Sequence, residues 1–367
     1  MLVTRRLRTL APAAALTVAA LTAAACSSSS SPSSSPPPSA GGGGTASNAA
    51  TTTLNVGVIS NSVAFFPLYV ARQQGYLTDE HLNVPTSPVL GTGARVAAAL
   101  AGGSIDVAAG VMTDAYNLAK TGKTPKVIAA LVNSYYVDIV VSGSAKVAPA
   151  NASLLTKIKS LKGLSIGITG PGSGTSALIT YLFKLAGMNP ATDATEVSLG
   201  SSPTAVLGAL KSGRVQALAF FQPIGQEAEA EGIGKIYISP SRGDIPALNG
   251  DVHGVMYTDA SNLTGKRQAI EEFVAAIAKA EQFIHTSSPA TVQSLLSKYE
   301  PAMKPATVAA MVPVLQKEIP AVPTISPAAY QIAATFHKTA GLVANPGPYA
   351  DMIDSSLISS AVQLAGT

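Results

Sequence analysis

Glycines, hydroxyl groups and backbone amides gather in one segment of this chain, Gly170 to Thr175. The segment Gly-Pro-Gly-Ser-Gly-Thr follows an apolar run and precedes a helical pattern. Glycines let a ligand approach the backbone closely, and the free amides at the start of a helix attract an anion. The segment is no Walker loop, because no Gly-Lys-Ser/Thr follows, and its glycines lack the dinucleotide-binding spacing. An anion site and a tight turn with a Ser/Thr cap both fit this segment taken alone.

Four more loops lie where a parallel α/β sheet would place a ligand, beyond the carboxyl ends of its strands. They are Ser60-Asn61-Ser62, Gly91-Thr92-Gly93, Gly110-Val111-Met112-Thr113 and Gln222-Pro223. Aromatic residues gather near the same loops, namely Phe65, Phe66, Tyr116, Tyr135, Tyr136, Phe220 and Phe221. Core packing is the commoner role for any one of them. Because Phe220 and Phe221 are adjacent in a predicted strand, at most one of the two faces a cleft.

The residue patterns of common enzymes are missing. The four histidines, His81, His253, His285 and His337, are scattered, and none forms a His-x-x-x-His pair or lies near a carboxylate cluster suited to a metal. No Gly-x-Ser-x-Gly elbow occurs. The sequence therefore favours a binding protein, with no catalytic residue, metal or cofactor expected.

The single cysteine, Cys26, closes an apolar stretch that begins behind Arg5, Arg6 and Arg8, and a Ser/Pro/Gly-rich run follows it. This order is typical of an export signal. The segment from Leu21 to Cys26 resembles a bacterial lipoprotein signal, although Ala23 stands where leucine is commonest. We therefore expect residues 1–25 to be a signal peptide and Cys26 to carry lipid on the outer face of the cell membrane. Residues 26–53 carry no charge and should form a flexible tether.

Charge and length narrow the class of protein further. The formal net charge is +4, but three of the 24 basic residues lie in the predicted signal, which leaves 21 against 20 acidic residues. A mature chain so close to neutral argues against a nucleic-acid partner, which needs a clustered basic patch. One cysteine allows no internal disulfide. The remaining ~340 residues are enough for two domains.

The chain carries an internal echo at a constant offset of 110 residues. Leu54 to Ile59 aligns with Leu164 to Thr169, and Ala99 to Asp106 aligns with Ala209 to Gln216. The first pair has the pattern of a buried strand, and the second pair that of a helix end, a glycine and a strand. A chance match in an alanine-rich composition is the alternative. Two copies of one unit predict two similar lobes.

Strands and helices alternate within each copy, which predicts sheets with helices on both faces. Helices are predicted from Phe66 to Gln74 and from Thr175 to Ala186, each followed by a glycine. The tail adds helical patterns that should pack onto the lobes rather than form a third core. They cover Gln268 to His285, Thr291 to Tyr299 and Ser326 to Ala340.

Several of these segments resemble one family. Phe65 to Leu77 looks like the first helix of periplasmic substrate-binding proteins of the nitrate/sulfonate/taurine type, a group that includes binders of thiamine-pyrimidine precursors. Ala99 to Val107 is similar to that family's helix–strand junction, and Ser160 to Gly167 with Gly172 to Thr175 resembles its entry into the second lobe. Gln222 departs from the acidic residue that usually precedes this proline.

The resemblance implies a type II periplasmic-binding-protein fold. Each lobe would hold a mainly parallel sheet flanked by helices, and two hinge segments would cross between the lobes, near Val140-Val141-Ser142 and near Leu248-Asn249-Gly250. Residues 54–140 plus 250–367 would form lobe 1, and residues 141–249 lobe 2. A monomer would close on a small-molecule ligand and dock on an ABC permease with its ATPase.

The predicted ligand site takes polar or aromatic residues from both lobes. Its members are Ser60, Asn61, Phe66, Gly93, Thr113, Tyr116, Ser173, Gly174, Thr175 and Gln222. None is charged, so helix ends would have to hold any anionic group, at ~0.3–2 kcal/mol per interaction. A small sulfonate-like anion is the preferred ligand, and a neutral pyrimidine-type vitamin precursor is the alternative.

Two other functions stay open at this point. The protein could be a lipoprotein that senses a ligand without feeding a permease. A pyrimidine-synthesising enzyme with the same fold is less favoured, because that branch is intracellular and its histidine- and cysteine-rich motif does not occur in this chain.

Overall fold

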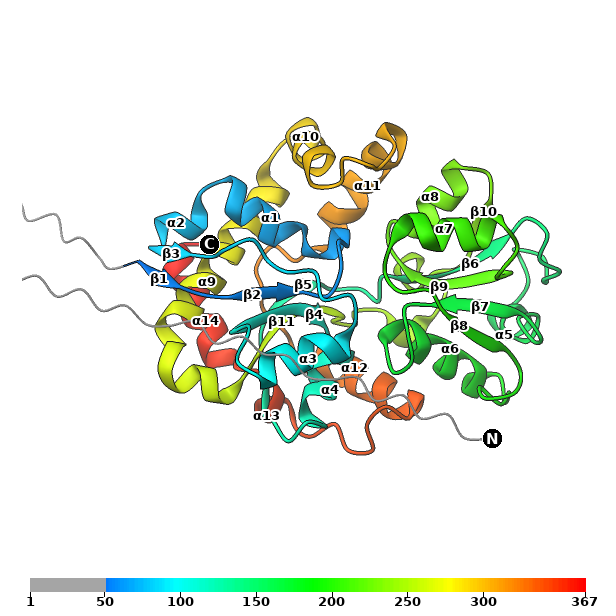
Figure 1. Ribbon diagram of the computed structural model, residues 1–367, viewed down its shortest axis with the longest axis horizontal. Helices are drawn as coiled ribbons and strands as arrows, with labels where there is room; N and C mark the ends of the chain where they lie inside the picture. The colour runs from blue at the N-terminus through cyan, green and yellow to red at the C-terminus, as the bar shows by residue number, and fades with distance from the viewer. Residues whose placement is uncertain (1–50) are drawn as a thin grey trace, which may run out of the picture. The chain divides into compact units, whose positions relative to one another are not determined.

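The computed structural model describes residues 51–367, which contain two main β-sheets with helices on both faces (Figure 1). The predicted signal peptide, nearly all of the predicted tether and the predicted lipidation at Cys26 lie outside the described residues. The α/β class and the two-lobed arrangement predicted from the sequence are confirmed. We call the four-stranded sheet with its helices the first lobe and the five-stranded sheet with its helices the second lobe.

The first-lobe sheet has the order β2-β4-β11-β5. Its strands are β2 (Val56–Val58), β4 (Val107–Val111), β11 (Gly254–Asp259) and β5 (Pro125–Val132). β2 and β4 are parallel, and β11 runs antiparallel to both of its neighbours. β1 (Thr52–Thr53) and β3 (Leu82–Asn83), which precede and follow β2 in the sequence, form a separate two-stranded parallel sheet.

The second-lobe sheet has the order β10-β6-β9-β7-β8. Its strands are β10 (Gly234–Ile238), β6 (Val137–Ser142), β9 (Ala217–Phe221), β7 (Ser165–Ile168) and β8 (Thr195–Ser198). Here β6 is the reversed strand, antiparallel to both β9 and β10. Each sheet is therefore mixed, with a single strand opposed to the rest. That strand, β6 or β11, is the one that the chain enters after leaving the other lobe.

The strand assignments correct the position of one predicted hinge segment. Val140, Val141 and Ser142 lie within β6 and pair with neighbouring strands, so they belong to the second sheet. The first crossing is the short stretch 133–136 between β5 and β6. The second crossing runs through 239–253 and includes the predicted stretch around Leu248. The prediction missed the early start of the second sheet because β5 and β6 form one nearly continuous apolar run.

The 110-residue echo is confirmed in the strand register. Val56 pairs with Val107 in the first lobe, and Ile166 pairs with Ala217 in the second. Both pairs are related by the same offset. The side-chain contacts repeat as well: Asp106 Oδ2 accepts from the Asn55 backbone N–H at 2.9 Å, and Gln216 Oε1 accepts from that of Ser165 at 2.8 Å. The helices α3 (Gly93–Ala101) and α7 (Pro203–Lys211) also correspond.

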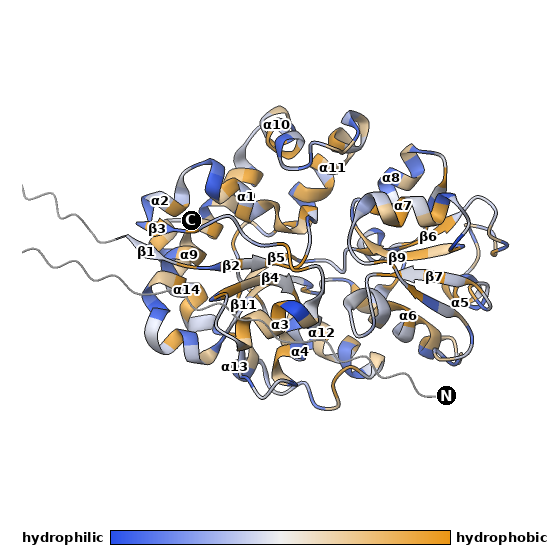
Figure 2. Cartoon of the chain, in the orientation of Figure 1, coloured by the Kyte–Doolittle hydropathy of each residue, from blue (hydrophilic) through white to orange (hydrophobic). Residues whose placement is uncertain are grey.

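Both faces of each sheet are buried, which explains the continuous apolar runs of the strands. In β4, Val107 and Ala109 face the cluster that holds the long helix α9 (Ala260–Thr286), while Ala108 faces the cluster that holds α3. Figure 2 shows the apolar strands between helices whose outer faces are hydrophilic. No helix within residues 51–367 has both the length and the apolar character needed to cross a bilayer.

The remaining helices complete the two lobes. The first lobe is covered by α1 (Phe66–Gln73), α2 (Tyr76–Asp79), α4 (Met112–Ala119), α10 (Pro289–Tyr299), α11 (Pro305–Glu318), α13 (Tyr349–Met352) and α14 (Ser355–Ala365). The second lobe contains α5 (Leu154–Lys159), α6 (Gly174–Leu185) and α8 (Ile224–Ala230). Two 3-10 turns, η2 (Pro240–Arg242) and η3 (Pro246–Leu248), lie on the second crossing, and a third, η1 (Val63–Phe65), directly precedes α1. α12 (Pro327–Ala340) contacts both α6 and α13, so the tail helices do pack onto the lobes.

Candidate functional site

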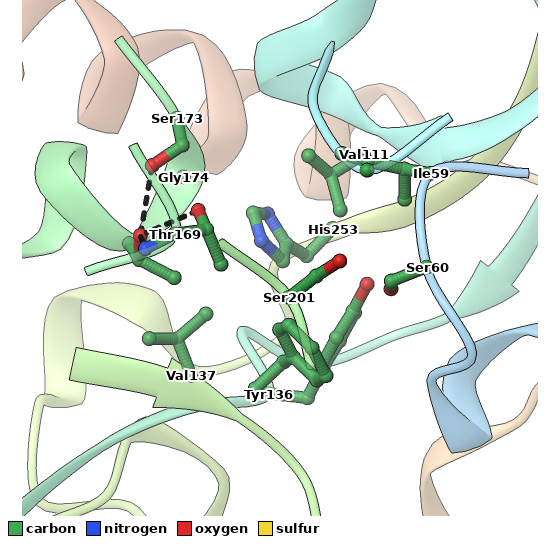
Figure 3. A pocket seen from close by; sticks show the side chains of 13 residues that line it. Ile59, Ser60, Val111, Tyr136, Val137, Thr169, Ser173, Gly174, Ser201 and His253 are labelled. Atoms are coloured by element: carbon green, nitrogen blue, oxygen red, sulfur yellow. Dashed lines mark hydrogen bonds between the residues drawn. The ribbon is translucent and has the colours of Figure 1, made fainter. Parts of the chain in front are cut away.

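A small cavity lies between the lobes at the ends of their strands (Figure 3). Its lining residues come from both lobes and both crossings: Ile59, Ser60, Gly91, Val111, Tyr136, Val137, Thr169, Ser173, Gly174, Thr175, Ser201, Phe221 and His253. It encloses about 40 Å³, which is room for about three water molecules at ~10–15 Å³ each. We call it the central cavity. None of its lining side chains carries a fixed charge.

The start of α6 forms one wall of the central cavity. Ser173 is the N-cap: its Oγ accepts from the Ser176 backbone N–H at 3.3 Å and donates to Gly170 O at 2.6 Å. Thr175 Oγ1 in turn accepts from the Thr169 backbone N–H at 3.0 Å. These bonds hold the loop in place. Within the described residues, the backbone N–H groups of Gly174 and Thr175 have no acceptor. They and the helix dipole provide an anion-binding end.

His253, on the second crossing, faces this helix end. Its ring stacks on Tyr135 with centroids 3.9 Å apart and meets Tyr136 edge-on at 5.1 Å. The side chain is 1% exposed, and its Nδ1 has no hydrogen-bond partner among residues 51–367. Burial lowers the pKa of His253 well below its usual value, so the imidazole is neutral at pH 7. It offers the cavity a hydrogen-bonding nitrogen without a charge.

Gly174, at the start of α6, packs closely against Thr113 of the first lobe and His253 of the second crossing. A Cβ at this position would lie 3.1 Å from His253 Cε1 and 3.5 Å from Thr113 Oγ1. The Gly174 carbonyl accepts a hydrogen bond of 2.6 Å from Tyr135 Oη. Glycine therefore permits a close contact here, which a Cβ would crowd, and does not serve an unusual backbone conformation.

The rest of the wall is mainly apolar. Ile59 follows β2, Val111 ends β4 and Phe221 ends β9, while Tyr136 and Val137 come from the first crossing and the start of β6. Hydroxyl groups of Ser60 and Ser201 add polar atoms opposite the α6 end (Figure 3). The arrangement suits a small molecule with one polar or anionic end and an apolar or ring portion.

The structure brings four predicted site residues together around the central cavity: Ser60, Ser173, Gly174 and Thr175. Thr113 lies just behind the wall, fully buried, with its Oγ1 2.8 Å from His337 Nε2. Tyr116 packs on the His337 ring at 4.9 Å, in the core behind Thr113. These two residues support the wall rather than line it.

The other four predicted residues lie elsewhere. Phe66 is fully buried in the core beside Tyr299, with ring centroids 5.9 Å apart, and Asn61 is exposed outside the cavity. Gly93 lies in a neighbouring space of about 460 Å³ beside the Gly170–Ser173 loop, where a Cβ would overlap the Asp114 carboxylate. Gln222 lines a separate cavity beside α8.

Sequence reasoning missed His253 and Ser201. The position of a crossing segment decides that His253 faces the cleft, and no local sequence pattern marks such a segment. Tyr136 and Phe221 were singled out only as members of an aromatic group. Of the adjacent pair, Phe221 reaches the central cavity and Phe220 is fully buried in the core, as strand alternation requires.

Solved structures share this architecture at low sequence identity. The alkanesulfonate-binding protein SsuA from Xanthomonas axonopodis pv. citri, bound to MOPS, is 19% identical with a TM-score of 0.65, over 83% of this chain and 99% of that chain. The periplasmic nitrate-binding protein NrtA from Synechocystis PCC 6803 is 16% identical with a TM-score of 0.68, over 86% and 89%. A ligand-binding component of an ABC-type import system from Staphylococcus aureus is 18% identical with a TM-score of 0.65, over 84% and 98%.

These likenesses establish the class of the fold, which is the two-lobed fold of periplasmic binding proteins. No curated protein sequence matches the chain. Residues 47–297, more than half of the chain, match the model of the NMT1-like family. The protein belongs to the NMT1-like family.

Proposed function

We propose that this protein is the extracytoplasmic solute-binding component of an ABC importer. It captures a small organic ligand in the central cavity and presents it to a permease with its ATPase. The observation that carries this proposal is a cavity lined by side chains from both lobes and both crossings, because only a closed arrangement makes both sets of contacts. Structural neighbours that are named as sulfonate-, nitrate- and import-system binding proteins support it.

The ligand that we propose is a sulfonate-like monoanion with a short apolar portion. Its oxygens would accept hydrogen bonds from the free N–H groups of Gly174 and Thr175 at the start of α6. Its apolar portion would pack against Ile59, Val111 and Phe221. With no basic side chain on the cavity wall, a single charge is the most that the helix end would stabilise, at ~0.3–2 kcal/mol.

Closure of the lobes is the proposed mechanism. Two further hydrogen bonds join the lobes beside the cavity: Asn117 Nδ2 donates to Gly172 O at 3.1 Å, and Ser62 Oγ donates to Gln222 O at 3.4 Å. The central cavity is too small in this arrangement for entry of an organic solute. A ligand would therefore bind while the lobes are apart and would favour their approach. Lipid on Cys26 would hold the monomer near its permease.

One observation favours a second ligand class, a neutral nitrogen heteroaromatic. The buried His253 is neutral, its Nδ1 is free within the described residues, and the rings of Tyr136 and Phe221 lie on the same wall. A pyrimidine-like ring would stack on these aromatics and exchange a hydrogen bond with the imidazole.

Calorimetric titration and thermal unfolding with matched probes test the proposal. Ethanesulfonate, a neutral aminopyrimidine and propanol would be added separately to the purified protein. A sulfonate ligand raises the stability by about 2.7 kcal/mol at 100 times its Kd, because it binds only the folded state. Ser173→Tyr should abolish this effect by filling the cavity, while Ser294→Tyr, the same change at an exposed site on α10, should keep it. A response to the aminopyrimidine alone would replace the anion with the heteroaromatic ligand, and no response to any small organic solute would reject a binding role.

A further inference from the structure

The two ring nitrogens of His253 have different surroundings. Nδ1 is buried and has no hydrogen-bond partner in the described part of the chain. The opposite edge of the ring faces the start of α6, where a Cβ on Gly174 would lie 3.1 Å from Cε1 and 3.2 Å from Nε2 (Figure 3). Because His253 lines the central cavity with this edge, Nε2 is the nitrogen that a bound molecule can reach.

A neutral imidazole carries one proton, which either nitrogen can hold. Burial, with His337 nearby, lowers the pKa of His253 well below its usual value, so the ring carries a single proton at neutral pH. A buried N–H without an acceptor is rarer in proteins than a buried lone pair without a donor. The surroundings of His253 therefore favour a proton on Nε2 and a bare Nδ1.

The neighbouring His337 has the opposite tautomer, because its partners determine it. Its Nδ1 lies 2.6 Å from the carbonyl oxygen of Ala333, which can only accept, so Nδ1 carries the proton. Nε2 of His337 is then bare and accepts from the Thr113 hydroxyl at 2.8 Å. Among residues 51–367, Nδ1 of His253 meets no carbonyl of this kind.

Two more hydrogen-bond donors lie beside Nε2 of His253. The backbone N–H groups of Gly174 and Thr175 have no acceptor within the described residues. The Gly174 carbonyl already accepts from Tyr135 Oη at 2.6 Å. Since a Cβ on Gly174 would lie 3.2 Å from Nε2, one oxyanion group is large enough to contact both the Gly174 N–H and the imidazole. The start of α6 and His253 together offer three donors.

We propose that His253 is a specificity-determining residue, which presents an N–H at Nε2 to the ligand and thereby selects an oxyanion that carries no proton. This inference rests on the proposed function, because it concerns the same site. The three donors match the three oxygens of a sulfonate, which only accept hydrogen bonds. A phosphonate of the same shape and charge keeps a P–OH group, whose proton needs an acceptor that these three donors do not offer.

Nitrogen NMR of the purified full chain with isotope-labelled histidine tests the tautomer without any ligand. A protonated and a bare ring nitrogen have well-separated chemical shifts, and His253→Gln assigns the signals of His253 by removing them. We expect a proton on Nε2, a bare Nδ1 and no change between about pH 6 and 8. A proton on Nδ1, or on both nitrogens, would overturn the proposal.

Calorimetry with ethanesulfonate and ethylphosphonate at about pH 6 tests the selectivity, since the two probes then carry the same charge and differ by one proton. Ethanesulfonate should bind about tenfold more tightly. His253→Leu, which removes the donor, should weaken ethanesulfonate binding about tenfold or more and abolish the preference. His253→Gln, which keeps an N–H, should retain most of both. His81→Leu, the same change at an exposed histidine, should alter neither.

The outcomes separate this inference from the proposed function. If the wild-type protein binds both probes equally, or if folded His253→Leu binds ethanesulfonate as the wild type does, the selectivity is wrong and the solute-binding role stands. If the wild type binds no ethanesulfonate, the anionic ligand of the proposed function fails, and the NMR result alone upholds or overturns the donor at Nε2. Thermal unfolding shows whether each variant is folded, and the comparison of probes on the wild type needs no variant.

Discussion

Gly174→Ala should weaken ligand binding while leaving the fold intact. The new Cβ would lie 3.1 Å from His253 Cε1 and 3.2 Å from Nε2, against an optimal separation of ~3.5–4.0 Å between such atoms. The His253 ring cannot withdraw easily, because Tyr135 stacks on it at 3.9 Å. Overpacking of this kind costs about 1–3 kcal/mol. This overpacking destabilises the closed arrangement, in which the two lobes are in contact.

An open arrangement of the lobes escapes this cost. Ligand affinity, which depends on closure, should therefore fall by about 5–150-fold, the equivalent of ~1–3 kcal/mol. Stability against unfolding should stay the same or rise by up to about 1 kcal/mol, because alanine restricts the unfolded chain and favours the helix. The expected signature is a loss of affinity without a loss of melting temperature.

Gly208→Ala is the matched control, because this glycine also lies in a helix and a Cβ there meets nothing within 4 Å. It should raise stability without changing affinity. Calorimetry with the ligand found in the screen and thermal unfolding without ligand measure the two quantities. If Gly174→Ala lowered the unliganded stability by 1–3 kcal/mol, the contact would persist without ligand and the closure argument would fail. Unchanged affinity would refute the placement of the ligand site.

Three further perturbations have defined outcomes. Tyr135→Phe removes the hydrogen bond to the Gly174 carbonyl and should weaken ligand binding by the equivalent of ~0.5–1.5 kcal/mol, measured by calorimetry. Asp138→Asn tests the pKa of Asp138, which burial raises to about 7: the protonated carboxyl favours the fold at low pH, and that stability is lost as pH rises from about 4 through 7. The variant should therefore lose this pH dependence, worth about 1.4 kcal/mol for each unit of pKa shift, in denaturant unfolding at pH 5 and 8. Cys26→Ser should release the protein from membranes in cell fractionation, and continued tight attachment would contradict lipidation.

The sequence predicted the fold because the fold repeats. The 110-residue offset relates Val56 to Ile166 and Val107 to Ala217, and both pairs occupy the same place in their sheets. Buried strands and helix ends carry local patterns that survive in both copies. The crossing at 133–136 carries no such pattern, since apolar residues continue on both sides of it. Its position depends on which sheet β6 joins, and that is determined by pairing with β9 and β10, which are far away in the sequence.

The candidate site was predictable to a similar degree. Ser173, Gly174 and Thr175 were found because a cap and glycines at a helix start have a local signature. Phe66 was misplaced because an aromatic residue in a helix near a strand end has the same pattern whether it faces the cleft or the core. Its ring packs against Tyr299, which lies far away in the sequence. His253 was missed because it has no local pattern: only the path of the second crossing brings it to the α6 end.

The exchange of strands between lobes explains why the hinge and the site share residues. β6 enters the second sheet directly from β5 of the first, and β11 enters the first sheet after β10 of the second. Residues just before these two strands must therefore lie between the lobes. They include Tyr135, Tyr136 and His253, which meet one another and the start of α6.

A ligand at the α6 end thus touches the segments whose backbone must rotate when the lobes part. Tyr136 and His253 would contact the ligand directly and also belong to the segments that move during closure, so no coupling through the core would be needed. Substitutions in the crossings should then change affinity and closure together, whereas substitutions of Ser60 or Ser201, which line only the cavity wall, should change affinity alone. X-ray scattering with and without ligand separates these two classes of variant.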